Sequence, residues 1–235
     1  MTILAFDTAT RATTVALSLS DDQVLHARDD PPAGQRPGHG ARLLVLVAEL
    51  LERAGMGWAQ VQRIAVGVGP GTFTGLRIGI ATARALAQAR SIPLVGISTL
   101  QSLALGASRS LSTGAQTVLA VTDARRGEVF AAAWLARDVE RGEPVLLSQR
   151  AFAPDTLAAR VAELGPCALA IGDGAVEFRR VLERAGSCVP PDGSELHRVS
   201  AVNHCRLAWG RPAGAPADVG PEYLRLPDAE IARLA

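Results

Sequence analysis

The chain has 235 residues; its 24 basic residues are all Arg, and 23 Asp and Glu leave a formal net charge of +1. This balance argues against a strong stand-alone nucleic-acid binder. The length suits one large domain or two small ones. No run of about 18 apolar residues occurs, so we expect no membrane span.

Cysteine usage and the N-terminus both favour a reducing compartment. Cys167, Cys188 and Cys205 are odd in number, scattered and without a CxxC pair. They predict neither a disulfide framework nor a zinc site. The opening MTILAFDTAT reaches Asp7 without a basic leader, so we expect no signal peptide and a cytoplasmic location.

The first half of the chain predicts three strands followed by alternating helices and strands. Strands are expected at residues 2–6, 14–19, 23–28, 64–68 and 93–97, and helices at 41–54, 73–90 and 99–108. The second and third strands are joined by a turn at Ser20-Asp21-Asp22, and the proline- and glycine-rich residues 30–40 form a loop. This β-β-β-α-β-α-β order is a ribonuclease-H-like arrangement.

Residues 66–90 carry the most distinctive pattern. A strand breaks at Gly69-Pro70-Gly71, and a helix then begins with Thr72 or Thr74 as its N-cap. A glycine loop before a helix is typical of an anion site. However, a Walker A loop needs Lys, and Thr74 stands where the dinucleotide fingerprint needs its third glycine. Two interpretations remain: a phosphate site, or a tight turn built by Gly69, Gly71 and Thr72 that allows close helix packing.

Two helices of the first half predict close helix packing. Gly75, Gly79 and Ala83 recur every fourth residue, so one stripe of the helix at 73–90 has almost no side chain. Another helix can pack on it at short range. The helix at 41–54 is apolar over most of its circumference, so we expect it to be covered on two sides. One cover is the chain's own sheet, and the other is either a partner or a second layer of this chain.

The second half repeats the order of the first. Strands are expected at 117–122, 128–135, 144–149 and 167–171, and helices at 154–164 and 175–185. TILAFDTATRATTVA matches VLAVTDARRGEVFAA, which places Asp7 opposite Asp123 and indicates an internal duplication. We therefore predict an α/β protein of two ribonuclease-H-like lobes, at 1–108 and 109–199. A segment at 200–225, with a helix at 202–209, rejoins the first lobe, and 226–235 form a tail.

Candidate chemistry lies at the two matched acids. In sugar-kinase-like lobes, hairpin turns that begin with an Asp hold the phosphates of ATP. Asp7 with Thr8 and Asp123 with Gly127 stand at such turns, but the first turn lacks glycine. An Asp that satisfies the amides of its own turn is the alternative. The four histidines predict no metal site, since Leu43 follows His39 by four positions, and no Ser-His-Asp signature is present locally.

The motifs ILAFDTAT, GVGPGTFTGLRIGIATARALA, DARRGEVF and PEYLR together resemble the TsaB (YeaZ) family of bacterial threonylcarbamoyladenosine synthesis, in an order that covers the chain to about Arg225. The resemblance implies two lobes of the actin-like ATPase, sugar kinase and Hsp70 fold. It implies a degenerate relative and partner of the catalytic subunit TsaD. With the ATPase TsaE, that pair transfers threonylcarbamoyl to the adenosine beside the anticodon of tRNAs that read codons beginning with A.

The resemblance also implies specific roles for this chain. The catalytic relative carries a metal-binding HxxxH pair, whereas this chain has only His39 of the pair. We therefore expect a non-catalytic subunit whose helices at 41–54 and 73–90 form a four-helix bundle with TsaD, or with a second copy when TsaD is absent. We expect no cofactor on this chain alone, ATP or ADP only in the complex, and tRNA contact only through it. The expected partner interface is Leu43, Leu46, Val47, Leu50, Gly75, Arg77, Ile78, Gly79, Thr82, Ala83 and Leu86. An independent ATP-dependent kinase or ATPase of the same fold is the alternative, and Asp7, Thr8, Asp123 and Gly127 are the vestigial phosphate-binding candidates.

Overall fold

A computed structural model describes residues 1–20, 23–32, 34–109, 111, 117–143, 146–165 and 168–224. These form two compact units: unit 1 is Met1–Ser102 with Val199–Pro221, and unit 2 is Leu103–Arg198 with the described residues after Pro221. The sequence predicts that the first lobe ends at residue 108 and that the segment returning to it ends at residue 225, whereas the two units divide after Ser102 and after Pro221. The turn residues Asp21 and Asp22, Cys167 and the predicted tail at 226–235 lie outside the described residues.

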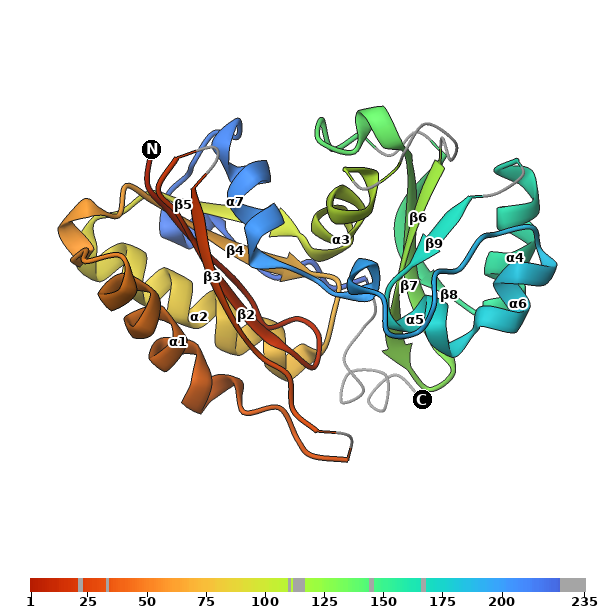
Figure 1. Cartoon of the computed structure of the whole chain (residues 1–235), viewed down its shortest axis with the longest axis horizontal. Helices are drawn as coiled ribbons and strands as arrows, with labels where there is room; N and C mark the ends of the chain where they lie inside the picture. The colour runs from red at the N-terminus through yellow and green to blue at the C-terminus, as the bar shows by residue number, and fades with distance from the viewer. Residues whose placement is uncertain are drawn as a thin grey trace. The chain divides into compact units, whose positions relative to one another are not determined.

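Unit 1 is a five-stranded mixed sheet with helices on both faces. Its strands are β1 (Ile3–Asp7), β2 (Thr13–Ser18), β3 (Val24–Asp29), β4 (Arg63–Gly69) and β5 (Leu94–Ser98), in the order β3-β2-β1-β4-β5. β1 runs antiparallel to β2 and parallel to β4. Helices α1 (His39–Arg53) and α2 (Phe73–Arg90) cover one face, and α7 (Ala201–Trp209) covers the other (Figure 1).

The alternation of β1 explains these layers. Leu4 and Phe6 point into a core that they share with Leu43, Leu50 and Leu76 of the two helices. The alternate residues Ile3, Ala5 and Asp7 lie on the side of α7, whose His204 reaches Asp7 and whose Cys205 thiol contacts the Ile3 carbonyl. Every residue of β1 is buried, as expected for a central strand covered on both faces.

Unit 2 repeats this plan with fewer strands. Its sheet contains β6 (Thr117–Arg125), β7 (Glu128–Leu135), β8 (Leu147–Phe152) and β9 (Leu169–Ile171), in the order β8-β7-β6-β9. The helices are α3 (Thr99–Ser108), within which the two units divide, α4 (Pro154–Glu163), α5 (Asp173–Glu177) and α6 (Arg179–Arg184). The strand order equals β3-β2-β1-β4 of unit 1, so the predicted duplication is confirmed.

Two predicted elements of unit 2 differ in the structure. β8 begins three residues later than expected, because pairing of Phe152 with Val129 and of Leu147 with Ala133 sets its register on β7. Pro144 and Val145 of the predicted strand lie outside the described residues. The helix predicted at 175–185 is two helices, broken at Phe178, whose side chain packs against the core of unit 2.

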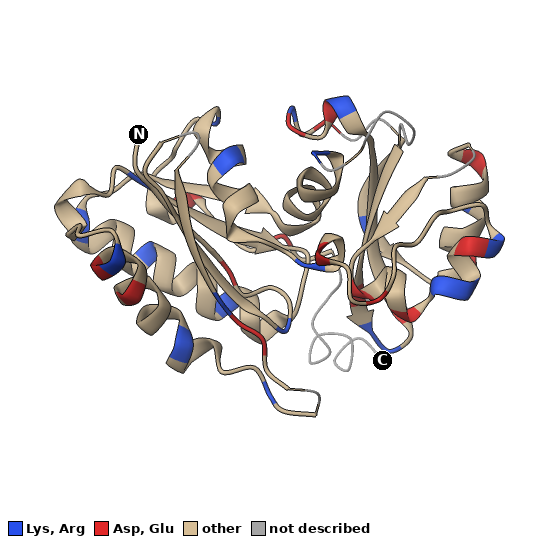
Figure 2. Cartoon of the chain, viewed as in Figure 1, with Lys and Arg blue, Asp and Glu red and all other residues tan. Residues whose placement is uncertain are grey.

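Charges are spread over both units. In the view of Figure 2, short blue and red segments are separated by tan ones, and no continuous basic face is visible. Within the part of the chain that the structure describes, no helix has the length and apolar character needed to cross a membrane.

Candidate functional site

Asp7, at the end of β1, is completely enclosed by its own chain. Its Oδ1 accepts the backbone N–H of Ala9 at 2.6 Å, and its Oδ2 lies 2.8 Å from the Thr99 hydroxyl, which donates to it, and 3.0 Å from His204 Nε2. A Cβ on Gly67 of β4 would lie 1.9 Å from the same Oδ2, so glycine is required beside this carboxylate. Both carboxylate oxygens are therefore occupied within unit 1.

His204 extends this site into a Ser-His-Asp grouping. Its Nδ1 lies 2.8 Å from Ser102 Oγ, and Ser102 also donates to the Ser200 carbonyl at 3.2 Å. No local sequence signature marks this grouping, because His204 stands 102 positions from Ser102 and 197 from Asp7. Asp7, Ser102 and His204 are all fully buried, so no substrate reaches the hydroxyl. The grouping joins β1, α3 and α7 as a structural network.

The network also sets the ionisation of Asp7. Burial alone would raise the pKa of this carboxyl group, but the hydrogen bond and charge of His204, with the Ala9 N–H and the Thr99 hydroxyl, hold the pKa below its ordinary value. Asp7 is thus a carboxylate paired inside the core.

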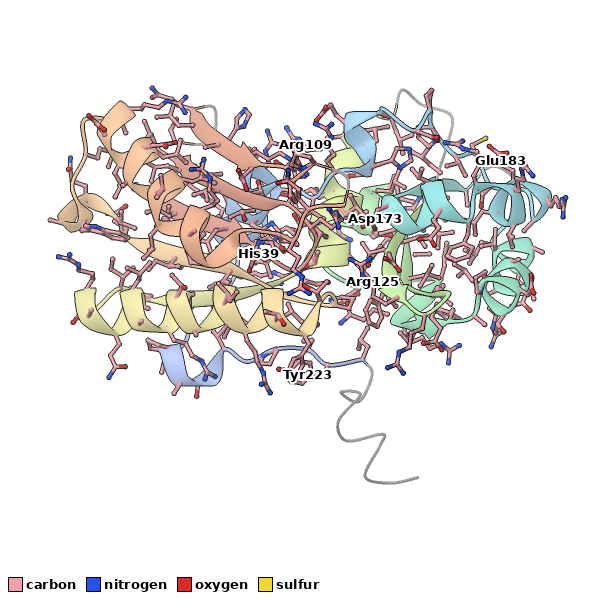
Figure 3. All side chains as sticks on the ribbon, turned by 90° about the horizontal axis from the view of Figure 1, so that it is seen from below. His39, Arg109, Arg125, Asp173, Glu183 and Tyr223 are labelled. Atoms are coloured by element: carbon pink, nitrogen blue, oxygen red, sulfur yellow. The ribbon has the colours of Figure 1, made fainter. Side chains whose placement is uncertain are left out.

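Asp123, the matched acid of unit 2, makes the same turn. Its Oδ1 accepts the N–H of Arg125 at 2.6 Å, as Asp7 accepts that of Ala9, and its Oδ2 forms a 2.9 Å ion pair with the Arg125 guanidinium. The register of β6 and β7 shifts at this point, and Arg125, Arg126 and Gly127 have φ of 66°, 56° and 74°. The Asp123 N–H donates to Asp173 Oδ1 at 3.0 Å, and Arg125 and Asp173 are both labelled in Figure 3.

Thr8 and Gly127 complete the four phosphate-binding candidates. The Thr8 hydroxyl donates to the Gly75 carbonyl at 2.7 Å, and Gly127 belongs to the β6–β7 turn. The four residues thus lie in two turns, one in each unit, and the side chains of the three that have functional groups bond to their own unit. In both turns the aspartate accepts a backbone N–H of its own turn, which is the arrangement expected if the acid stabilises the turn.

His39 begins α1 and is also bonded within the chain. Its Nδ1 lies 2.8 Å from the Thr13 hydroxyl, and its side chain is buried. Burial lowers the pKa of His39, although the nearby carboxylates of Asp7 and Asp29 and the Thr10 carbonyl oppose this effect. Among the described residues, no group of three His, Cys, Asp or Glu side chains is placed to hold a metal ion.

The small-residue stripe of α2 faces inward, so the expectation that it is open to another helix is wrong. A Cβ on Gly75 would lie 2.0 Å from the Thr8 carbonyl oxygen, and one on Gly79 would lie 2.4 Å from the Thr8 hydroxyl. Ala83 is fully buried. The stripe exists because α2 packs closely against the end of β1.

Four of the expected interface residues on α1 are likewise part of the core. Leu43, Leu46, Val47 and Leu50 are buried against the sheet of unit 1. The apolar run LLVLV of α1 therefore divides between its two faces, with Leu44 and Val45 on the solvent side at 51% and 43% exposure.

Eight of the exposed residues on these two helices are named here the outer helix face: Ala41, Leu44, Val45 and Ala48 on α1 and Phe73, Arg77, Ala81 and Ala85 on α2. The exposed residues of the two helices also include Glu49, Glu52 and Thr74. Arg77 stacks over the Phe73 ring, 3.7 Å from its centroid. Ile78, Thr82 and Leu86 are half-buried. Sequence reasoning missed Leu44 and Val45 because consecutive apolar residues do not reveal which of them face the sheet.

The glycine loop before α2 packs against the β1–β2 turn. Gly69 has a φ of 109°, which favours glycine, and its peptide bond to Pro70 is cis. The Thr72 N–H donates to the Ala9 carbonyl at 2.7 Å, and a Cβ on Gly71 would lie 2.4 Å from that oxygen. Thr72 is the N-cap residue of α2, without a side-chain capping bond. This geometry corresponds to the tight-turn interpretation.

Comparison with known families locates a match in the middle of the chain. The profile of the family described as "TsaD: tRNA N6-adenosine threonylcarbamoyltransferase" matches residues 31–149. This range includes α1 and α2 of unit 1 and β6 and β7 of unit 2.

Individual relatives extend the likeness over nearly the whole chain. The tRNA threonylcarbamoyladenosine biosynthesis protein TsaB of Escherichia coli is 42% identical over 130 residues, which is 55% of this chain and 53% of that protein. The uncharacterized protein Rv3421c of Mycobacterium tuberculosis is 36% identical over 97% of this chain and 94% of its own length. The solved structure of YeaZ from Pseudomonas aeruginosa has 31% identity and a TM-score of 0.75, covering 95% of this chain and 99% of that one.

Proposed function

The chain belongs to the TsaB (YeaZ) family, and we propose that it is a non-catalytic accessory subunit in the biosynthesis of tRNA threonylcarbamoyladenosine. Its partner is the catalytic subunit TsaD, and the two act with the ATPase TsaE. The pair transfers threonylcarbamoyl to the adenosine next to the anticodon of tRNAs that read codons beginning with A. This chain contacts tRNA only through the complex, and we place the reaction in the cytoplasm.

The outer helix face supports the pairing with TsaD. Leu44 and Val45 expose apolar side chains one after the other on a helix whose opposite side already fills the core of unit 1. An exposed apolar surface of this kind is typical of a protein–protein interface. Ala81 and Ala85 lie on the exposed side of α2, where small side chains permit close approach of a partner helix. The same surface pairs two copies when TsaD is absent.

The closed acids support the non-catalytic role. Asp7 is bonded to Ala9, Thr99 and His204, and Asp123 is bonded to Arg125. The Asp7 carboxylate is sealed from any phosphate or metal ion, and the Asp123 carboxylate is already paired with the Arg125 guanidinium. Nucleotide therefore belongs to the complex rather than to this chain alone.

The pairing is tested by Leu44→Glu and Val45→Glu. Each places a charge on the outer helix face, so we expect a loss of at least about tenfold in TsaD co-purification and in modified tRNA from the reconstituted reaction. Since both side chains are on the surface, the free energy of unfolding should change by less than about 0.5 kcal/mol. Ala59→Glu, on the exposed turn η1 (Trp58–Gln60), is the matched control and should change neither readout.

The pairing would be refuted by either Glu variant that co-purifies with TsaD at wild-type yield. The kinase alternative is tested separately by calorimetry of the isolated chain with ATP and Mg²⁺. Tight binding, with turnover abolished by Asp123→Asn, would show that the chain is an enzyme in its own right.

A further inference from the structure

His197, in the short helix η3 (Glu195–His197) of unit 2, bonds to backbone groups through both of its ring nitrogens. Its Nδ1 accepts the backbone N–H of Gly172 at 3.1 Å, and its Nε2 lies 3.1 Å from the Pro190 carbonyl oxygen. A backbone N–H can only donate a hydrogen bond, and a carbonyl oxygen can only accept one. The two contacts together therefore assign one state to the ring, which is neutral with its single proton on Nε2.

A second proton on this ring would find no acceptor in the folded chain. Both nitrogens of a charged imidazole are donors, so an Nδ1–H would face the Gly172 N–H and the bond between them would be lost. The Pro190 carbonyl also accepts from the Arg179 guanidinium, so a charged ring would share that oxygen with another positive group. His197 is buried, and water does not readily replace the lost partner. Proton uptake and the bond to Gly172 therefore exclude each other.

Gly172 is the junction between β9 and α5. Its φ of 110° lies in the region that favours glycine, and a Cβ there would lie 2.0 Å from the Val121 carbonyl oxygen of β6. The next residue, Asp173, accepts the Asp123 N–H at 3.0 Å. The bond between His197 and Gly172 thus holds the junction from which α5 supports the turn at Asp123.

Other ionisable side chains lie in the segments around the imidazole, but none of those that the structure describes bonds to it. They form the ion pairs Asp123–Arg125, Arg179–Asp192, Arg179–Glu183 and Glu195–Arg198, and they include Asp173 and Glu177 of α5. Asp173 also lies at the junction, and carboxylates take up protons in acid as well. The experiment therefore has to separate the effect of His197 from that of Asp173.

We propose that His197 is a pH switch in unit 2: the neutral imidazole holds the junction between β9 and α5, and uptake of one proton at Nδ1 releases Gly172 and loosens the turn at Asp123. The junction is held above the pH range in which histidine is protonated, and it opens as the pH falls through that range. The step moves one proton from solvent onto the ring and breaks one hydrogen bond, so it reverses when the pH is raised.

The state of the ring is tested by nitrogen-15 NMR of the unaltered full chain. At about pH 7.5 we expect Nε2 of His197 to carry a proton and Nδ1 to carry none, and on acidification Nδ1 should gain its proton. The midpoint of that proton uptake should coincide with the midpoint at which the Gly172 amide loses its protection from exchange. Two protonated ring nitrogens at about pH 7.5, or two clearly different midpoints, would overturn the switch.

The opening is tested by hydrogen exchange, expressed as protection factors so that the direct effect of pH on exchange cancels. Between about pH 7.5 and pH 5.5 the protection of the Gly172 and Asp123 amides should fall about tenfold, while that of β1 in unit 1 stays constant. His197→Gln offers an amide oxygen to Gly172 and an NH₂ group to the Pro190 carbonyl but takes up no proton, so it should keep its protection at both pH values. His26→Gln, at an exposed histidine of β3, is the matched control and should lose protection as the unaltered chain does.

Equal protection of Gly172 at both pH values in the unaltered chain would refute the switch. So would a His197→Gln variant that loses protection as fully as the unaltered chain, because Asp173 or another acid would then open the junction. If glutamine does not bridge the two backbone groups, Gly172 of this variant is unprotected at both pH values, and the two midpoints of the unaltered chain decide. The outer helix face belongs to unit 1, so none of these outcomes bears on the proposed pairing with TsaD.

Discussion

Asp7 and His204 place a carboxylate and an imidazole together where solvent does not reach. Removing one member of a buried pair leaves the other without its partner, which is more costly than the net value of the pair. We expect His204→Ala to lower the free energy of unfolding by about 3 kcal/mol, measured by urea denaturation. The cavity it leaves is lined by Asp7, Thr99 and Ser102, so added imidazole should restore part of the loss. A decrease below about 1 kcal/mol would contradict the structural role of the pair.

The same pair gives unit 1 a defined response to acid. The pKa of Asp7 in the folded chain lies below the ordinary value of 3.8, so its contribution to stability is complete above that value and is lost as pH falls through the folded pKa. Asp7→Asn should remove this part of the acid dependence. Urea midpoints of the two proteins between pH 6 and pH 3, about the range over which carboxylates protonate, provide the measurement. If the urea midpoints of the two proteins fell in parallel with decreasing pH, Asp7 would not be the source of this acid dependence.

Cys205 and Cys188 differ in the reactivity that their surroundings allow. Burial raises the pKa of the Cys205 thiol to about 12, so at pH 8 it is a protected thiol within the core. Cys188 is exposed. We expect iodoacetamide to label Cys188 in the native chain and Cys205 only after unfolding, as mapped by peptide mass spectrometry. Equal labelling of both in the native chain would show that α7 opens readily.

At the scale of elements, α2 approaches the end of β1 closely, and two glycines of α2 differ in how strictly that approach requires them. A Cβ on Gly75 would meet a backbone oxygen of Thr8, whereas one on Gly79 would meet only the hydroxyl of that residue. Gly75→Ala should therefore lower the free energy of unfolding by about 2 kcal/mol or more, despite the better helix propensity of alanine. Gly79→Ala should cost less, since a side-chain atom can move. Urea denaturation compares the two variants, and equal losses would contradict this packing.

The helices and strands themselves were largely predictable from the sequence. Which side of each helix packs against the sheet was not. The helix at 73–90 was predicted with its observed bounds, because glycine, Thr72 and the apolar period mark it locally. Which side of α2 meets the sheet depends on Thr8, far away along the chain. The sequence pattern therefore favours a partner helix on the stripe at Gly75 and Gly79, whereas in the structure this stripe is sealed against Thr8 at the end of β1. The predicted bounds of β8 are wrong for the same reason, because pairing with β7 decides where this strand begins.

The candidate site shows the same division between local and distant information. The acids at Asp7 and Asp123 followed from the internal repeat, and the structure gives both the same turn. The residues that bond the second carboxylate oxygen of each acid could not be predicted from the repeat. His204 reaches Asp7 from α7, and no spacing rule connects residues 197 positions apart.

At the scale of the whole molecule, unit 1 is assembled from both ends of the chain. Residues 199–221 return to it, and α7 packs against β1 and β2, with the Ala201 N–H donating to the Thr14 hydroxyl at 3.1 Å. Truncation after Arg198 removes the returning residues 199–221, and with them α7 and His204. We expect this variant to lose the amide protection of β1, β2 and β4 in hydrogen exchange, whereas truncation after Leu224 should retain it. Equal protection in both would show that α7 is dispensable.

The two matched turns give the halves of the molecule unequal sensitivity to ions in solution. One aspartate is enclosed where salt does not reach, and its carboxylate lies 3.0 Å from the Nε2 atom of a histidine that has no exposed surface. Its counterpart is balanced by an arginine whose side chain is 56% exposed. Raising the ionic strength weakens attraction between exposed charges and leaves enclosed ones almost unaffected. A concentrated salt solution should therefore loosen the Asp123 hairpin while the Asp7 turn keeps its geometry, which makes the repeat symmetric in backbone and asymmetric in its electrostatics.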